Sequence, residues 1–527
     1  MTTHIDRARI DREVGEYYRY ATFSHKWEDN EPLFENVVRI VVYELEESLT
    51  HDKLRMFCKI VRDLGFHWAW SDTCCINKAD HFVLQEALVS MFKWYEGSAV
   101  TIVLLRGVRS PSKRGELVRS IWNSRAWTLQ EYHASKVVRF YTEDWKPYLD
   151  LDILNHKESP EIISEMEEAT RVSARALMAL RPGLDDIREK LRLASIRQTT
   201  RVEDAAYSLL GIFSMSLGVV YGEGDKALGR FLAQLLTSSG DTAILAWTGK
   251  SGSFNSCLPT SIAVFDQLPT MHIPQSLEHV EMDKIVARLR SSSLSSSIMR
   301  LYDRLQDLPV VLFVGQRMKL PCLNFKVGRL SASRSDLGYV FRAQTSLLGV
   351  VEITAEEDLS QLGSLFLVHP WIDFLLDRQP VGSVAGSTVE TIPEEEPDDQ
   401  SSTVGEFPSF PGTSNITLTP LQTQATGLVA LLGRPFGVQI PTFRQLGDAV
   451  SLRPPSSLSP MEVQMRALQV IARLRQPFGA LLLTPHPGNV AAYRRVATEN
   501  VITVRVEEIT PTILDKLVKS ARTLDVL

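Results

Sequence analysis

The apolar run at 99–105 constrains the fold of this chain more than any other feature. A strand that is apolar on both faces is typical of a parallel sheet covered by helices on both sides. Further strand-like segments occur at 19–24, 66–72 and 137–141, and segments with helical periodicity separate them. This alternation predicts an α/β fold with a mostly parallel sheet in residues 1–150.

Three helices are expected between these strands, at 34–63, after Asp80 and around 115–134. We expect a break in the first helix near Thr50-His51. Asp80 is expected to cap the second helix, because aspartate before a periodic apolar face is a common N-cap. Ligands of such sheets bind beyond the carboxyl ends of the strands, so polar residues at those ends are the first candidates for a site.

Beyond residue 150, the predicted type of secondary structure changes several times along the chain. Residues 151–300 are predicted to be largely helical. Residues 301–380 are predicted to be β-rich, with strands near 310–314, 338–342 and 365–368.

A linker and a last ordered region are expected beyond residue 380. Residues 381–425 are rich in Ser, Thr, Pro and Gly and contain the acidic run 393–399, so we expect them to be disordered. Residues 426–527 predict a small α/β region, with strands at 480–484 and 501–505.

Composition argues against several classes of function. A net charge of −6 is weak for 527 residues, which argues against nucleic-acid or membrane-surface binding. No apolar stretch approaches 18 residues and the N-terminus lacks an apolar signal core, so neither a transmembrane helix nor a secretory signal is expected. The five cysteines are too few and too scattered for a disulfide framework, which indicates a reducing, cytoplasmic location.

A metal site is not expected either. Cys74 and Cys75 are adjacent, and three histidines lie within about 60 residues of them. No CxxC pair or HxxxH pair accompanies them, and neighbouring side chains in a strand point to opposite faces.

Two strand ends and one helix supply the candidate site residues. Ser24 and Asp72 fall at the carboxyl ends of predicted strands, while Trp127 and Glu131 are spaced i, i+4 and share one helix face. Trp127 can stack on a flat ring or pack in the core, and Asp72 can line a crevice or anchor a strand end. Arg125 can contact a phosphate or pair with Glu131.

A second motif block follows in the helical region. It comprises Arg192-Leu-Ala-Ser-Ile-Arg-Gln-Thr-Thr-Arg201, Glu203-Asp-Ala-Ala-Tyr207, Leu209-Leu-Gly-Ile-Phe213 and Tyr221-Gly-Glu-Gly224. The last of these predicts a turn that ends a helix, because no GK[ST] follows to make a phosphate-binding loop.

Three blocks together resemble the fungal heterokaryon incompatibility (HET) domain. They are Tyr20-Ala-Thr-Phe-Ser-His-Lys-Trp27, Trp70-Ser-Asp-Thr-Cys-Cys-Ile-Asn77 and Arg125-Ala-Trp-Thr-Leu-Gln-Glu131. The block at 199–224 resembles the region that follows this domain in mushroom-type fungal members. The chain departs from the family pattern at His25-Lys26, at Glu28 where glycine is common, and at Lys78 where glutamine is frequent.

The resemblance implies a TIR/flavodoxin-like parallel sheet and a part in non-self recognition and programmed cell death. TIR domains are similar in architecture, and in their enzymatic members the glutamate four residues after a tryptophan cleaves NAD. By this analogy Glu131 is the expected catalytic residue, with NAD as substrate and neither cofactor nor metal. The analogy and the motifs together imply substrate contacts from Ser24, Trp27, Asp72, Asn77, Arg125 and Trp127.

Two alternatives to catalysis remain open from the sequence. One is a non-enzymatic module that signals death by self-association or by binding other death-signalling proteins. The other is a degenerate copy of the family, since the residues around Trp27 are altered.

Overall fold

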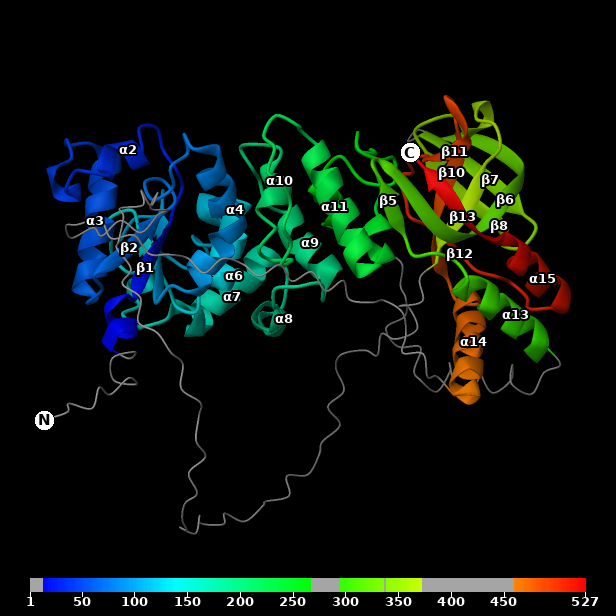
Figure 1. Ribbon diagram of the computed structural model, residues 1–527, viewed down its shortest axis with the longest axis horizontal. Coiled ribbons are helices and arrows are strands. Elements are labelled where there is room, and N and C mark those ends of the chain that lie inside the picture. The colour runs from blue at the N-terminus through cyan, green and yellow to red at the C-terminus, as the bar shows by residue number, and fades with distance from the viewer. Residues whose placement is uncertain (1–12, 267–293, 336–337, 372–458) are drawn as a thin grey trace, which may run out of the picture.

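The computed structural model describes residues 13–266, 294–335, 338–371 and 459–527. Their elements follow one another along the long axis of the molecule (Figure 1). A parallel sheet with its helices lies at one end, a helical region lies in the middle, and a β-rich body lies at the other end. This arrangement confirms the predicted α/β fold with a helical region and a β-rich C-terminal part.

The N-terminal sheet has four parallel strands in the order β2-β1-β3-β4. The strands are β1 (Tyr20–Ser24), β2 (Trp68–Ser71), β3 (Val100–Leu105) and β4 (Val138–Thr142). Nearly every residue in them is buried, as expected for a sheet covered on both faces. Ser24 closes the central strand β1, opposite Val103 of β3.

Helices cover both faces of this sheet. They are α3 (Leu49–Asp63), α4 (His81–Glu96), α5 (Ile121–Ser124) and α6 (Trp127–Ala134). The chain steps from β1 to β2 in one direction and from β2 to β3 and β4 in the other. Right-handed crossovers therefore place α3 on one face and α4 and α6 on the opposite face (Figure 1). The order reverses between β1 and β3, which is where such sheets bind ligands.

The helix predicted over 34–63 is shorter in the structure. Only α2 (Phe34–Val37), the 3₁₀ turn η1 (Val42–Glu44) and α3 form within this range. Val41 and Leu45 are extended, and the Ser48 side chain accepts a hydrogen bond from the His51 backbone at 3.1 Å, which starts α3. The break therefore ends at Ser48, close to the predicted position near Thr50-His51.

The helices predicted after Asp80 and around 115–134 lie closer to the helices that the structure contains. Asp80 caps α4 as predicted, because its side chain accepts hydrogen bonds from the backbones of Phe82 and Val83. The helix predicted around 115–134 is two short helices, α5 and α6, since Arg125 between them is extended.

The middle region is helical, as predicted. It contains α7 (Pro160–Thr170), α8 (Ala174–Ala179), α9 (Ile187–Ser195), α10 (Asp204–Tyr207) and α11 (Lys226–Ser239), with 3₁₀ turns η2 (Tyr148–Asp150), η3 (His156–Glu158), η4 (Thr242–Leu245) and η5 (Ile262–Phe265). An isolated parallel bridge joins Arg125 to Gln198, so this region meets the N-terminal sheet unit at the start of α6.

The C-terminal body is built on one nine-stranded mixed sheet. Its strands are β5 (Leu312–Val314), β6 (Arg317–Ser335), β7 (Gly338–Thr345), β8 (Gly349–Ala355), β9 (Phe366–Pro370), β10 (Phe478–His486), β11 (Asn489–Arg495), β12 (Ile502–Val504) and β13 (Ala521–Val526). Its helices are α13 (Ser295–Gln306), α14 (Pro460–Leu474) and α15 (Pro511–Ser520), with the 3₁₀ turn η6 (Leu359–Gln361).

Strands from distant parts of the chain pair in this sheet. β9 pairs with both β6 and β10, and β13 pairs with β6. The linker predicted at 381–425 lies outside the described residues. The domain boundaries drawn from composition stay predictions.

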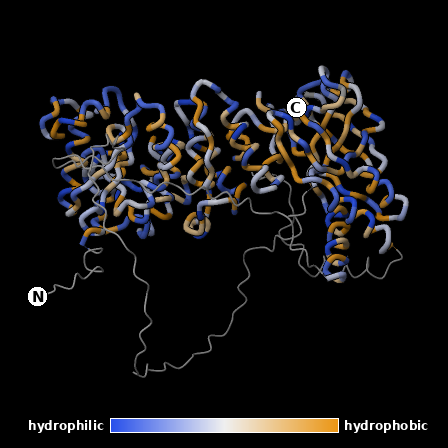
Figure 2. Tube along the Cα trace, in the orientation of Figure 1, coloured by the Kyte–Doolittle hydropathy of each residue, from blue (hydrophilic) through white to orange (hydrophobic). Residues whose placement is uncertain are grey.

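Two hydrophobic cores hold the described residues together. One runs from the N-terminal sheet through the middle helices to β5 and β13, and the other fills the C-terminal body between its sheet and α13, α14 and α15. In Figure 2 the orange hydrophobic stretches follow the strands of the C-terminal body, and blue positions follow its outer turns. Within the described ranges, no helix has both the length and the apolar character needed to cross a bilayer.

Candidate functional site

The side chains of Ser24 and Glu131 are in contact at the carboxyl end of β1. The hydroxyl of Ser24 donates a hydrogen bond to the Oε2 atom of Glu131. Ser24 in turn accepts a hydrogen bond of 2.7 Å from the indole Nε1 of Trp122 in α5. Because an indole nitrogen only donates, the serine oxygen must accept from it, and the serine proton is left to point at Glu131.

The Glu131 carboxyl group is buried on α6, where its residue is only 6 % exposed. Burial raises its pKa to about 7, and the nearby charge of Asp72 acts in the same direction. The Ser24 hydrogen bond and the charges of Arg125 and Arg197 oppose this rise. The carboxyl group therefore changes between acid and carboxylate near neutral pH, a property common among groups that transfer protons.

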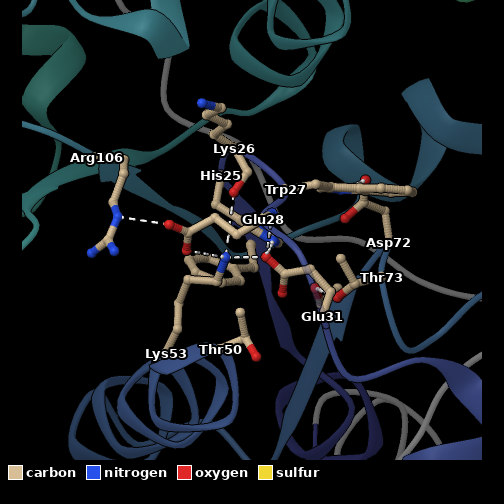
Figure 3. A network of polar contacts seen from close by, with 12 residues as sticks. His25, Lys26, Trp27, Glu28, Glu31, Thr50, Lys53, Asp72, Thr73 and Arg106 are labelled. Carbon is tan, nitrogen blue, oxygen red and sulfur yellow. Dashed lines mark hydrogen bonds and ion pairs between the residues drawn. The ribbon is translucent and has the colours of Figure 1, made fainter. Parts of the chain in front are cut away.

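Asp72 and Trp27 lie together at the edge of the sheet (Figure 3). Asp72 follows β2, and its Oδ2 atom accepts a hydrogen bond of 2.9 Å from Trp27 Nε1. The ammonium group of Lys78 lies 3.7 Å from the centre of the Trp27 ring, a cation–π contact. Lys78 also donates to the Thr73 carbonyl at 3.1 Å, so it ties the Trp27 ring to the segment that follows β2.

Arg125 lies at the joint between α5 and α6, and a buried arginine from the middle region supports it. Arg197 donates to the Arg125 carbonyl at 3.0 Å and to Thr128 Oγ1 at 2.8 Å. Burial lowers the pKa of Arg197 to about 10, so it keeps its charge at neutral pH. The side-chain Nε of Arg125 is buried and has no hydrogen-bond partner within the part of the chain that the structure describes.

The Trp127 side chain contacts the middle region of the chain. It is hydrogen-bonded to Asp204, whose pKa is raised by burial. Tyr221 also donates to Asp204, at 2.9 Å. Tyr221 opens the predicted Tyr-Gly-Glu-Gly turn, which is held because Glu203 accepts from the backbone N–H groups of Gly222 and Gly224. This turn lies before α11 instead of ending a helix.

Asn77 has a local contact. Its side-chain oxygen accepts a hydrogen bond of 3.1 Å from the Ala79 backbone, in the turn before α4. Among the described residues, no group of three or more histidine, cysteine, aspartate or glutamate side chains is arranged to hold a metal ion.

The structure thus brings most of the predicted residues into two neighbouring groups. Ser24 and Glu131 form one, with Arg125 close enough for its charge to act on the carboxyl group. Trp27 and Asp72 form the other, and the charge of Asp72 reaches Glu131. Trp127 and Asn77 contact other partners. Whether these residues bind a substrate stays a prediction.

Comparisons with known proteins agree with the sequence motifs. The family model of the heterokaryon incompatibility protein (HET) matches residues 20–116. That range contains β1 to β3 together with Trp27, Asp72 and Asn77.

Residues 20–116 therefore have the sequence pattern of a HET domain.

A vegetative incompatibility protein, HET-E-1 of Podospora anserina, is 32 % identical over 258 residues. The match covers 46 % of this chain but only 18 % of that relative. No solved structure matches the chain. The HET model ends at residue 116, so Glu131 and Trp127 lie beyond the part that it matches.

The sequence motifs did not reveal every residue of this site. Trp122 was missed because nothing in the sequence links it to Ser24, which lies 98 positions away. Arg197 belongs to the motif block at 192–201, but its contact with α6 depends on how the middle region packs. Lys78 was noted only as a departure from the family pattern, although it lies on the ring of Trp27.

Proposed function

We propose that this protein acts in heterokaryon incompatibility, as a non-self recognition protein whose HET domain brings about the death of the cell. The support is the HET family match together with the identity to a protein named for vegetative incompatibility. Since the chain spans 18 % of that relative, its own trigger and partners are part of the proposal.

The proposed chemistry is hydrolysis of NAD at Glu131. The observation that carries it is a buried carboxyl group with a pKa of about 7, hydrogen-bonded by Ser24 beneath the carboxyl end of a parallel sheet. Release of nicotinamide from NAD passes through a ribose with positive charge at C1′, as in glycoside hydrolysis. An ionised carboxylate beside that carbon lowers the energy of this state.

The reaction balances with water alone. The bond between C1′ and the nicotinamide nitrogen breaks, and its electron pair leaves with neutral nicotinamide. Water then adds to C1′, and the proton that it loses passes to Glu131 and from there to solvent. ADP-ribose, nicotinamide and one proton are the products, so no cofactor or metal is needed.

The other residues have supporting roles in this proposal. Trp122 and Ser24 hold the Glu131 carboxylate in one orientation through their hydrogen bonds. Arg197 holds Arg125 and the start of α6 in place through its hydrogen bonds to the Arg125 carbonyl and to Thr128. Trp27 and Asp72 border the same sheet edge and supply a flat ring and a polar group for a nucleotide.

Access to Glu131 requires a conformational change in this proposal. The residue is 6 % exposed, so a ribose reaches its carboxylate only when part of the covering structure moves. A signal that moves this cover would switch the enzyme from a closed to an active state.

A second candidate function is signalling by self-association without catalysis. The observation in its favour is a group of exposed apolar side chains just before and at the start of α3. They are Val38, Ile40, Val41, Tyr43 and Leu49. Several exposed apolar side chains in one short segment provide apolar area for a protein–protein contact.

Expression in fungal cells tests the proposed function. Wild-type protein, Glu131→Gln and the control Glu86→Gln are expressed at equal levels, and viability and cellular NAD are followed. Glu86 is a suitable control because it is an exposed glutamate on α4. We expect loss of NAD and of viability with wild type and with Glu86→Gln, and neither with Glu131→Gln. Cell death that persists in Glu131→Gln without loss of NAD would favour self-association instead.

A further inference from the structure

The Glu28 carboxylate is held between two cations. Its Oε1 atom accepts from Arg106 Nε at 2.8 Å, and its Oε2 atom accepts from Lys53 Nζ at 3.2 Å (Figure 3). Glu28 lies in the loop after β1, Arg106 directly follows β3, and Lys53 lies near the start of α3. These three residues are called the Glu28 clamp below.

The clamp lies at the place where a doubly wound sheet binds its ligands. The strand order reverses between β1 and β3, and the Glu28–Arg106 pair joins the segments that follow these two strands. The start of α3 also faces this edge, and its partial positive charge favours an anion. One carboxylate of the chain therefore lies at the sheet edge where ligands bind in related folds.

Both cations have a second carboxylate that keeps them in position. Lys53 is buried and also binds Glu31, and burial alone would raise the pKa of Glu31, but contacts with His25 and Lys53 lower it to about 2. Burial lowers the pKa of His25, which favours the neutral form of its ring. Arg106 lies 3.8 Å from Glu143. Lys53 and Arg106 therefore stay in place when Glu28 leaves.

A buried polar group beside the clamp lacks a hydrogen bond. The His25 side chain is 1 % exposed, and its Nε2 atom lies 3.7 Å from Glu31. Within the described ranges, neither ring nitrogen of His25 has a hydrogen-bond partner. A buried polar group without a hydrogen bond is costly, and Glu31 is the nearest acceptor to this ring.

We propose that Glu28 occupies the position of the diphosphate group of a nucleotide, and that Lys53 and Arg106 bind this group when the Glu28 side chain swings out. A diphosphate offers the same two contacts as the carboxylate, with more charge and more acceptor oxygens. The Glu28 side chain is 25 % exposed and lies in a loop, so it can leave without unfolding a helix or strand.

This inference rests on the proposed function, because it gives the NAD site a phosphate subsite and a closing device. Glu131 comes from α6 on one face of the sheet, whereas Lys53 comes from α3 on the other. A dinucleotide that crosses the sheet edge would present its ribose to Glu131 and its phosphates to the clamp.

Calorimetric titration of the full chain with inorganic pyrophosphate and with ADP tests the clamp. The variants are wild type, Glu28→Gln, Asp29→Asn and Glu28→Gln with Arg106→Gln. Asp29→Asn is the matched control, because it removes the same charge from the neighbouring residue, whose side chain is exposed. Circular dichroism confirms that each variant is folded.

We expect Glu28→Gln to bind both ligands about 10- to 100-fold more tightly than wild type, the gain of one charge-assisted contact. Asp29→Asn should change binding by no more than about twofold, and the added Arg106→Gln should remove the gain. Equal gains in Glu28→Gln and Asp29→Asn would overturn the proposal, since net charge alone would explain them. Binding of pyrophosphate without ADP would overturn the assignment to a nucleotide.

The binding measurement does not depend on catalysis. Tighter binding in Glu28→Gln without NAD turnover in any variant would support the clamp and contradict the proposed hydrolase. Turnover in wild type, with binding and KM unchanged in Glu28→Gln, would support the hydrolase and contradict the clamp.

Discussion

At the scale of single residues, Glu131 determines how stability should depend on pH. Its pKa is about 7 in the folded protein against an ordinary value of 4.5. At this site the folded state therefore binds a proton more tightly than the unfolded state, and the contribution of Glu131 to stability falls as pH rises from about 4.5 to about 7. Above about pH 7 the carboxyl group is ionised, and the full free-energy cost of burying this charge opposes folding.

Glu131→Gln should remove this pH dependence. The glutamine stays neutral and can still accept from Ser24, so the variant should gain stability relative to wild type as pH rises. Between about pH 5 and about pH 8 the difference in the free energy of unfolding should grow by about 2–3 kcal/mol. Urea unfolding of both proteins at the two pH values measures it. A constant difference would mean that Glu131 ionises as an ordinary exposed glutamate.

At the scale of elements, Gly211 sets how closely the middle region approaches the HET domain. A Cβ atom at this position would lie 2.3 Å from Phe92 Cβ in α4 and 2.9 Å from Gln130 Oε1 in α6. Both distances are too short for unbonded atoms, so a side chain here must push the helices apart.

Gly211→Ala should therefore destabilise the fold by about 1–3 kcal/mol. Gly218→Ala is the matched control, because the nearest atom to its added Cβ lies 3.8 Å away and belongs to the flexible side chain of Arg230. Thermal unfolding compares the two. Equal melting temperatures for both variants would contradict the close packing of α4 and α6 against residue 211.

At the scale of the whole molecule, Arg495 joins the C-terminal body to the middle region. This buried arginine of β11 donates to the carbonyls of Leu245 and Trp247, at 2.9 and 2.5 Å. Its guanidinium lies 3.8 Å from the centre of the Trp247 ring. Asn255 adds contacts to the carbonyls of Gln316 and Val526.

Arg495→Met should weaken this junction by about 2–4 kcal/mol, because it leaves two buried carbonyls without donors. Because one hydrophobic core continues from the middle helices to β5 and β13, the loss should appear as a lower free energy of unfolding of the whole chain in urea. Arg494→Met is the control, because Arg494 pairs with the partly exposed Glu357 inside the C-terminal body. It should cost about 1 kcal/mol or less. Equal losses in Arg495→Met and Arg494→Met would show that Arg495 does not couple the two parts.

The sequence predicted the elements of this molecule better than their contacts. The apolar run at 99–105 and the cap Asp80 depend on neighbours in the chain, and both predictions are confirmed. The helix over 34–63 was predicted too long, because periodic valines gave a helical pattern where the backbone is extended at Val41. The meeting of Ser24 with Glu131 follows from strand and helix positions, whereas the packing of Arg197 against α6 depends on tertiary contacts.

NAD consumption by the purified full chain is the most direct test of the central claim. Wild type, Glu131→Gln and Glu86→Gln are incubated with NAD at high protein concentration, and nicotinamide and ADP-ribose are quantified. We expect equal amounts of both products from wild type and Glu86→Gln, a rate that rises through about pH 7 as Glu131 ionises, and at least about a hundredfold loss in Glu131→Gln. Turnover that survives Glu131→Gln, or no turnover in wild type, would contradict the assignment of a hydrolase to this site.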